Sequence, residues 1–185
     1  MHLVVRFSVF LALILGAACC RSRSPESARS GNDTVKAAVS APRAVPAIDE
    51  QDLNRLISER HGKVLFLSIW ATWCVPCKEE FPDLIRLHHE LGGQQVEIVG
   101  ISADYEDEVE SKIVPFLQKM NVPFQNYVAS FKHQEDFINA VDSSWNGALP
   151  VSLIYDPQGG KTYFHLGKGT FEQFKREIEK TKGGL

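Results

Sequence analysis

Cysteine is scarce in this chain, with four residues among 185. Two of them, Cys19 and Cys20, lie in an apolar N-terminal stretch, which leaves Cys74 and Cys77 as the single pair in the rest of the chain. A structural zinc site takes four ligands, and there is no second cysteine pair to complete one. The scarcity therefore confines cysteine chemistry to the short segment that holds Cys74 and Cys77. An inert structural disulfide is one interpretation of this pair.

Long apolar runs are also few. The run from Phe7 to Ala18 follows Arg6 and has twelve residues. As a helix it reaches about 18 Å, well short of the ~30 Å hydrocarbon core of a bilayer. We therefore predict an export signal over residues 1–20. Small residues running into Cys19 resemble the lipobox of bacterial lipoproteins, so Cys19 is the candidate for lipidation; plain secretion and an uncleaved signal anchor are the alternatives.

Aromatic residues are absent from Arg21 to Ala47, a stretch rich in Ser, Ala, Pro and Arg. This composition predicts a disordered linker over residues 21–47. Residues 48–185, the predicted folded domain, carry 14 Lys and Arg and 21 Asp and Glu side chains, a net charge of −7. Because such a domain repels phosphate backbones, its charge argues against nucleic-acid binding as its main activity.

Hydrophobic periodicity predicts strands alternating with helices in the folded domain. Asp49 can cap a helix, because its carboxylate can accept from free first-turn amides. The nearly continuous apolar run from Val64 to Trp70 is typical of a strand buried on both faces. Further strands are predicted at 96–102, 124–128, 151–155 and 162–166, and helices at 50–59, 74–91, 106–120, 134–141 and 170–180. This order predicts an α/β fold with a mixed sheet flanked by helices.

Cys74 and Cys77 lie where the strand at 64–70 passes into the next helix. One helical turn brings residues three apart together. Free amides and the macrodipole at a helix N-terminus stabilise a thiolate, so Cys74 is the predicted nucleophile. Cys77 shares an apolar stripe with Phe81 and Leu84 and is predicted to face inward as the resolving thiol. The spacing favours redox chemistry over a structural disulfide.

The segment 68–82, which contains Trp73-Cys74-Val75-Pro76-Cys77, resembles the thioredoxin superfamily, and more closely its TlpA/ResA-like branch of tethered extracytoplasmic thiol-disulfide oxidoreductases. Gly147-Ala148-Leu149-Pro150, followed by a strand, resembles the second hallmark of that branch. The resemblance implies a thioredoxin-like fold with the CxxC at the N-terminus of the active-site helix. It also implies a cis peptide bond at Leu149-Pro150. The substrate-binding residues that it implies are Trp73, Pro76, Leu149 and Pro150.

One position departs from the thioredoxin pattern. Thioredoxins have a buried acidic residue where this chain has Ser68. Glu80, one turn beyond Cys77, is the predicted proton-handling group in its place; the alternative is that Glu79 and Glu80 form an ordinary solvated helix face. His133 and His165 are expected at the surface.

The predicted reaction is thiol-disulfide exchange, in which Cys74 attacks a protein disulfide and Cys77 resolves the mixed disulfide. No metal or organic cofactor is required, because the Cys74–Cys77 disulfide carries the electrons. The resemblance implies a membrane thiol-transfer protein as reductant. It also implies an extracytoplasmic location, in the periplasm or at the cell-envelope face, with a membrane tether through the N-terminus.

The alternative from another class is a copper-binding or metallochaperone module that uses the two thiolates and a histidine; a peroxidase is a weaker alternative.

Overall fold

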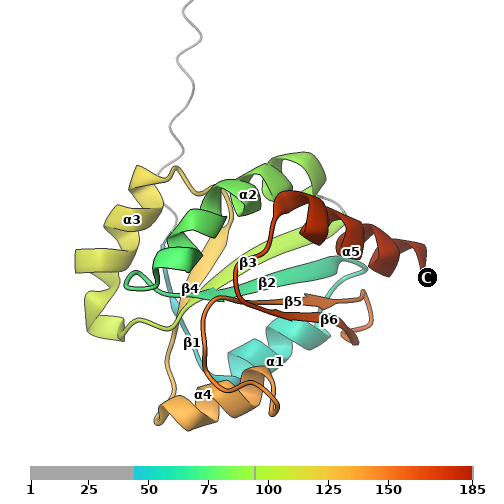
Figure 1. Ribbon diagram of the computed structural model, residues 1–185. Helices are drawn as coiled ribbons and strands as arrows, with labels where there is room; N and C mark the ends of the chain where they lie inside the picture. Colours follow the sequence, from blue (N-terminus) through green and yellow to red (C-terminus); the bar gives the residue numbers. More distant parts are fainter. Residues whose placement is uncertain (1–43, 94, 185) are drawn as a thin grey trace, which may run out of the picture. The chain divides into compact units, whose positions relative to one another are not determined.

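The computed structural model describes residues 44–184 except residue 94 (Figure 1). The export signal at 1–20, Cys19 and most of the linker predicted at 21–47 lie outside the described residues. The folded domain begins earlier than expected, because Val45 packs against the core and Ala47–Ile48 forms a short strand, β1. Among the described residues, no helix combines the length and hydropathy needed to cross a membrane.

Six strands form one mixed sheet in the order β1-β4-β3-β2-β5-β6. β1, β4, β3 and β2 run parallel to one another, whereas β5 is antiparallel to both β2 and β6. This confirms the mixed sheet and the closing hairpin expected from the sequence. The remaining strands are β2 (Val64–Trp70), β3 (Val96–Ser102), β4 (Gln125–Ala129), β5 (Val151–Tyr155) and β6 (Lys161–Leu166).

Helices cover both faces of the sheet (Figure 1). They are α1 (Glu50–Ser58), α2 (Val75–Leu91), α3 (Val114–Lys119), α4 (Gln134–Val141) and α5 (Phe171–Gly183). α2 and α5 lie on one face, and α1 and α4 on the other. Capping fixes where two of them begin: Asp49 accepts from the Asp52 amide at 2.8 Å, and Thr170 accepts from the Gln173 amide at 3.3 Å.

The helix predicted at 106–120 is wrong as a continuous α-helix. A 3-10 turn at Glu106–Glu108 and a π-helical turn at Val109–Ile113 precede the short α3. Pro115 gives the physical reason, because proline has no amide hydrogen and its ring clashes with the carbonyl one turn earlier. The apolar pattern still buries Ile113 on the α2 side of the sheet.

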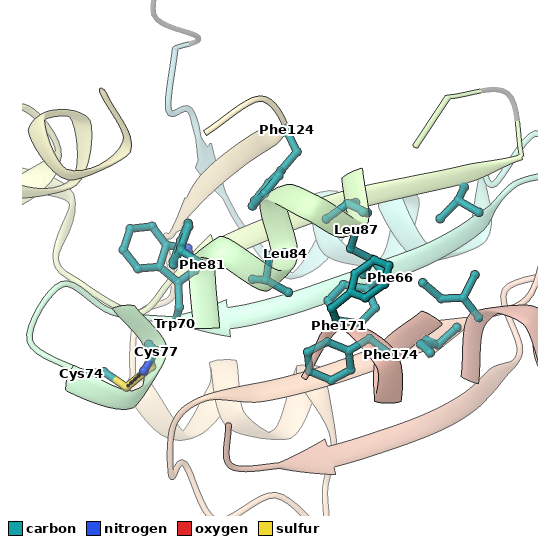
Figure 2. Packing of buried hydrophobic residues seen from close by; sticks show 14 of the residues in the cluster. Phe66, Trp70, Cys74, Cys77, Phe81, Leu84, Leu87, Phe124, Phe171 and Phe174 are labelled. Atoms are coloured by element: carbon teal, nitrogen blue, oxygen red, sulfur yellow. Dashed lines mark hydrogen bonds between the residues drawn. A yellow bond between two sulfur atoms is a disulfide. The ribbon is translucent and has the colours of Figure 1, made fainter. Parts of the chain in front are cut away.

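Side chains of β2 alternate between two cores. Val64, Phe66 and Trp70 pack on the α2 and α5 side, whereas Leu65, Leu67 and Ile69 pack on the α1 and α4 side. Aromatic rings pack edge to face in the core on the α2 and α5 side. The rings of Trp70 and Phe81, and those of Phe66 and Phe174, have centroids 4.8 Å apart (Figure 2). β2 is therefore fixed from both faces over its whole length.

A hydrogen bond from Trp70 Nε1 to Asn126 Oδ1, 3.0 Å long, joins β2 to β4 above Gly100. A Cβ added at Gly100 would lie 2.1 Å from Asn126 Oδ1. We therefore expect Gly100→Ala to lower the free energy of unfolding by about 2 kcal/mol, through overpacking and loss of this bond. Urea unfolding measures the change. Gly183→Ala is the control, since no atom lies within 4 Å of its added Cβ; equal stability of the two variants would contradict the prediction.

Candidate active site

Cys74 occupies the N-cap of α2, and Cys77 follows in its first turn. The two form a disulfide with their Cα atoms 5.3 Å apart (Figure 2). The Cys77 amide also donates to Cys74 Sγ at 3.2 Å. This is the position where a capping side chain meets the free amides of a helix, so the site favours a negative charge on the Cys74 sulfur. The predicted placement of the CxxC at the start of the active-site helix is confirmed.

The disulfide is largely buried, while its neighbours in the chain are exposed. Cys77 is 1% exposed and Cys74 only 5%. Trp73, at 63%, and Val75 stand out on either side of Cys74, and Pro76 is exposed as well. Since the two cysteine residues differ little in exposure, the N-cap position of Cys74 is the main difference between them. Trp70, at the end of the strand that was predicted to be buried on both faces, is buried in the core.

Asp104 anchors the loop that carries Cys74, a feature that the sequence analysis missed. Its carboxylate accepts from the Thr72 amide at 2.8 Å and from the Thr72 hydroxyl at 2.6 Å. The Ser102 hydroxyl also donates to it, at 2.5 Å. The available signal was topological: β2 and β3 are parallel neighbours, so residues just after each strand meet at one edge of the sheet.

Tyr105, next to this anchor, is the most exposed large apolar side chain in the described part of the chain, at 77%. The Asp104 to Thr72 bonds tie its loop to the loop that carries Trp73. Two exposed aromatic side chains therefore belong to adjoining loops at the same edge of the sheet as the disulfide.

Glu80 is buried, with 1% of its surface exposed, and lies one turn beyond Cys77. Its Oε2 accepts from the Gly169 amide at 2.7 Å. Burial raises the pKa of Glu80 to about 7; the Gly169 hydrogen bond lowers the pKa, Asp83 raises it and Lys168 lowers it. The alternative of a solvated face is wrong for Glu80 and holds for Glu79, whose exposed carboxylate pairs with Lys168 at 3.1 Å. The proton-handling role of Glu80 stays a prediction.

The Leu149-Pro150 peptide bond is cis, as the family resemblance implied. Pairing of Ile69 with Val151 places Pro150 beside the end of β2, where the active-site loop begins. Pro150 is buried, and Leu149 is half-buried against both cores. Substrate contact by these two residues stays a prediction.

The two histidines named in the sequence analysis differ. His133 is exposed, as expected. His165 is half-buried on the edge strand β6: its ring stacks on Tyr163 with centroids 6.1 Å apart, and its Nδ1 lies 3.3 Å from the Gln173 side chain. Among the described residues, no three His, Cys, Asp or Glu side chains gather as metal ligands would. The cofactor-free site and the copper-binding alternative both stay predictions.

A family model described as AhpC/TSA matches residues 41–161, which include the disulfide and the cis-proline. The chain belongs to the AhpC/TSA family. This places it in the thioredoxin superfamily, as the CxxC and its surroundings predicted.

Relatives of this AhpC/TSA-family protein include two bacterial thiol-disulfide oxidoreductases named ResA. The protein from Geobacillus kaustophilus (strain HTA426) is 28% identical over 152 residues, covering 80% of this chain and 82% of the relative. The protein from Bacillus subtilis (strain 168) is 29% identical over 133 residues, covering 70% and 67%.

Solved structures share the fold at lower identity. A thiol:disulfide interchange protein from Chlorobium tepidum TLS has a TM-score of 0.56 at 20% identity and covers 66% of this chain and 81% of its own. A thioredoxin-related protein from Neisseria meningitidis serogroup B has a TM-score of 0.56 at 22% identity, with 66% and 87% covered. The thioredoxin-like fold is therefore confirmed, and the chain is an enzyme of the thioredoxin-like thiol-disulfide oxidoreductase type.

Removal of the Glu80 carboxylate should change how stability depends on pH. The pKa of Glu80 is about 7 in the folded chain against 4.5 for an ordinary glutamate, so between these values the folded state holds a proton that the unfolded state has released. The unfolding free energy should then fall by up to about 3 kcal/mol as pH rises through this window. Glu80→Gln should lack this fall. Urea unfolding of the oxidised protein at several pH values measures it.

The matched control for this prediction is Glu79→Gln, which removes the neighbouring exposed carboxylate and should keep the wild-type dependence. Parallel curves for wild type and Glu80→Gln across the window would contradict the raised pKa of Glu80.

Proposed function

We propose that this chain reduces disulfide bonds of exported proteins on the extracytoplasmic side of a membrane. The observation that carries the proposal is the arrangement at the start of α2. Cys74 caps α2, Cys77 lies in the first turn of that helix, and the buried Glu80 follows one turn after Cys77. This arrangement supplies a nucleophile, a resolving thiol and a proton acceptor in one helical segment.

The reaction begins with the reduced dithiol. The Cys74 thiolate attacks one sulfur of the substrate disulfide, forms a mixed disulfide and releases the first substrate thiolate. Cys77 then attacks Cys74 Sγ, which releases the second substrate thiolate and leaves the Cys74–Cys77 disulfide. The substrate gains two electrons and the dithiol loses two. The N-cap position of Cys74 favours the thiolate needed for the first attack.

The second attack requires Cys77 to lose its proton, and Glu80 is the group we assign to take it. Side chains three residues apart on a helix have Cβ atoms about 5–6 Å apart. A carboxylate with a pKa of about 7 accepts and returns a proton near neutral pH, as a general base should. Deprotonated Glu80 takes the proton as Cys77 becomes the thiolate, and returns it when the disulfide is reduced again.

Substrate contact is assigned to the exposed rim and to the cis-proline loop. Trp73 and Pro76 flank the disulfide and reach solvent. Leu149 and Pro150 lie at the end of β2, at the edge of the sheet where the active-site loop begins. A substrate polypeptide that contacts both places would bring its disulfide toward Cys74.

The location and the direction of electron flow rest on the sequence and the relatives. The apolar segment before Cys19 predicts export, with Cys19 as a lipid attachment point for tethering. Relatives at 28% and 29% identity are named thiol-disulfide oxidoreductase ResA. A membrane thiol-transfer protein is the reductant that we propose for the Cys74–Cys77 disulfide, and no metal or organic cofactor takes part in the scheme.

Cys77→Ser should accumulate mixed disulfides with substrate proteins, because the first attack survives and the second cannot occur. Cys74→Ser should accumulate few, because the sulfur at the helix N-cap is gone. Gels run with and without reductant, after acid trapping of cells that express each variant, show the adducts. Equal trapping by the two variants would show that the two roles are wrongly assigned.

A further prediction concerns the redox potential of the pair. Among the described residues, Cys74 Sγ receives one hydrogen bond, from the Cys77 amide, so little over-stabilises its thiolate. The potential should therefore lie near the thioredoxin value of about −270 mV rather than the DsbA value of about −120 mV. Equilibration in glutathione buffers, followed by alkylation and mass spectrometry, measures it. A value at the DsbA end would contradict the assignment as a reductant.

A further inference from the structure

A row of small and polar residues crosses the sheet beneath α2, where apolar side chains would be expected. Gly100 on β3 pairs with Ser68 on β2, and Ser68 pairs with Ser152 on β5. Ser152 in turn pairs with His165 on β6. Directly paired residues on antiparallel strands, as in the Ser68–Ser152 and Ser152–His165 pairs, have Cβ atoms about 4.5–5.5 Å apart. The row therefore runs without a break from the centre of the sheet to its edge strand.

The row faces the same core as the active site. Side chains two positions away on the same strands, Phe66 and Trp70 on β2 and Ile154 on β5, belong to the core beneath α2 and α5. Alternation along a strand puts Ser68 and Ser152 on that face as well. The His165 ring confirms the direction on β6, because its centroid lies 6.2 Å from that of Phe174 on α5.

Four buried polar atoms on this side have no hydrogen-bond partner among the described residues. They are Ser68 Oγ, Ser152 Oγ, His165 Nε2 and Glu80 Oε1. A buried polar group without a partner is costly, and nearly all such groups in folded proteins bond to protein or to ordered water.

Glu80 is held beside the part of this row that lies on β5 and β6. Its Oε2 accepts from the Gly169 amide, four residues after His165. In the same loop, the Gly167 amide donates to the Pro150 carbonyl at 2.8 Å, two residues before Ser152. The Glu80 carboxylate therefore reaches the neighbourhood of β5 and β6, with Oε1 as the oxygen not used by Gly169.

We propose that Ser68, Ser152 and His165 position ordered water as a proton path that connects Glu80 with solvent at the edge of the sheet. The proposal rests on the proposed proton acceptance by Glu80. The path gives Glu80 a route for proton exchange with bulk water, to which a carboxylate that is 1% exposed has little direct access. Sites that are polar and offer several partners are those where buried water is held.

The proton count is balanced at each step. Cys77 gives one proton to Glu80 as its thiolate forms, and Glu80 gives one proton to the row. Each hydroxyl or water accepts one proton and passes on another. The imidazole of His165 closes the row, because it can accept at one ring nitrogen and release from the other. One proton reaches solvent for each Cys77 thiolate, and the flow reverses when the disulfide is reduced.

Charged groups act mainly at the Glu80 end. Asp83 on α2 and Lys168 in the loop before α5 face Glu80. Around His165, the described side-chain contacts are Tyr163 on β6 and Gln173 and Phe174 on α5, and none of these is a carboxylate, ammonium or guanidinium group. The path thus runs from Glu80, which has charged neighbours, to the half-buried His165, whose described side-chain contacts include none.

The test follows the two chemical steps separately in the full-length reduced chain, with glutathione disulfide as the probe. Samples quenched with acid at intervals and weighed by mass spectrometry give the rates of adduct formation at Cys74 and of resolution by Cys77. Ser68→Ala and Ser152→Ala should each slow resolution roughly tenfold, and leave adduct formation within about twofold of wild type. The double variant should be no slower than the slower single variant, because one break interrupts a path.

Conservative variants and a matched control complete the design. Ser68→Thr and Ser152→Thr keep the hydroxyl and should restore the resolution rate. His165→Phe keeps the ring between Tyr163 and Phe174 but removes Nε2, and should slow resolution like the serine variants. Ser58→Ala on α1, an exposed serine away from the row, should have no effect. Thermal unfolding checks each fold, and if an alanine variant fails to fold, His165→Phe and the threonine pair decide the question.

Three results would overturn the path. Resolution rates in the serine variants and His165→Phe within about twofold of wild type, while Glu80→Gln is slowed, would remove the path and leave the proposed function standing. Losses that multiply in the double variant would show independent packing effects. An unchanged rate in Glu80→Gln itself would remove the proton-handling part of the proposed function together with the path.

Discussion

The burial of β2 on both faces is the constraint on which the site depends. Because one set of its side chains packs under α2 and α5 and the other packs over α1 and α4, the strand cannot shift in register without exposing a core. The fixed end of β2 places Cys74 at the N-cap of α2, where the Cys77 amide points at its sulfur. Asp104 holds the intervening loop through Thr72. The redox pair is thus set by backbone geometry.

Burial of Glu80 shows how the same packing supplies chemistry. A carboxylate on the apolar side of a helix loses water, and one amide hydrogen bond from Gly169 replaces only part of that solvation. Its pKa therefore rises to about 7. Burial of Glu80 therefore lowers the free energy of unfolding near neutral pH. In return it provides a group that can exchange protons with a neighbouring thiol. This is the usual trade at an active site, where a buried ionisable group is kept for its function.

Much of this architecture could be predicted from residue patterns. The bounds of β2, β3, α4 and β5 agree with the apolar runs, and the cap at Asp49 agrees with its position before a helical stripe. Prediction failed where local signals conflict or are weak. Pro115 broke the helix expected at 106–120, and β1 is too short to show a period. A strand pattern also does not show that the His165 ring packs against Phe174 of α5.

The sequence by itself determined what depends on neighbours in the chain: the CxxC at the junction of a buried strand and a helix, the place of Cys74 at the start of that helix and the inward stripe of Cys77 and Phe81. Tertiary structure alone decided what depends on distant groups. Gly169, which binds Glu80, is 89 residues away, and Asp104 is 32 residues from Thr72. Solvation, hydrogen bonding and charge at a side chain are set by whatever packs around it, and strand order, which no local pattern encodes, determines which residues those are.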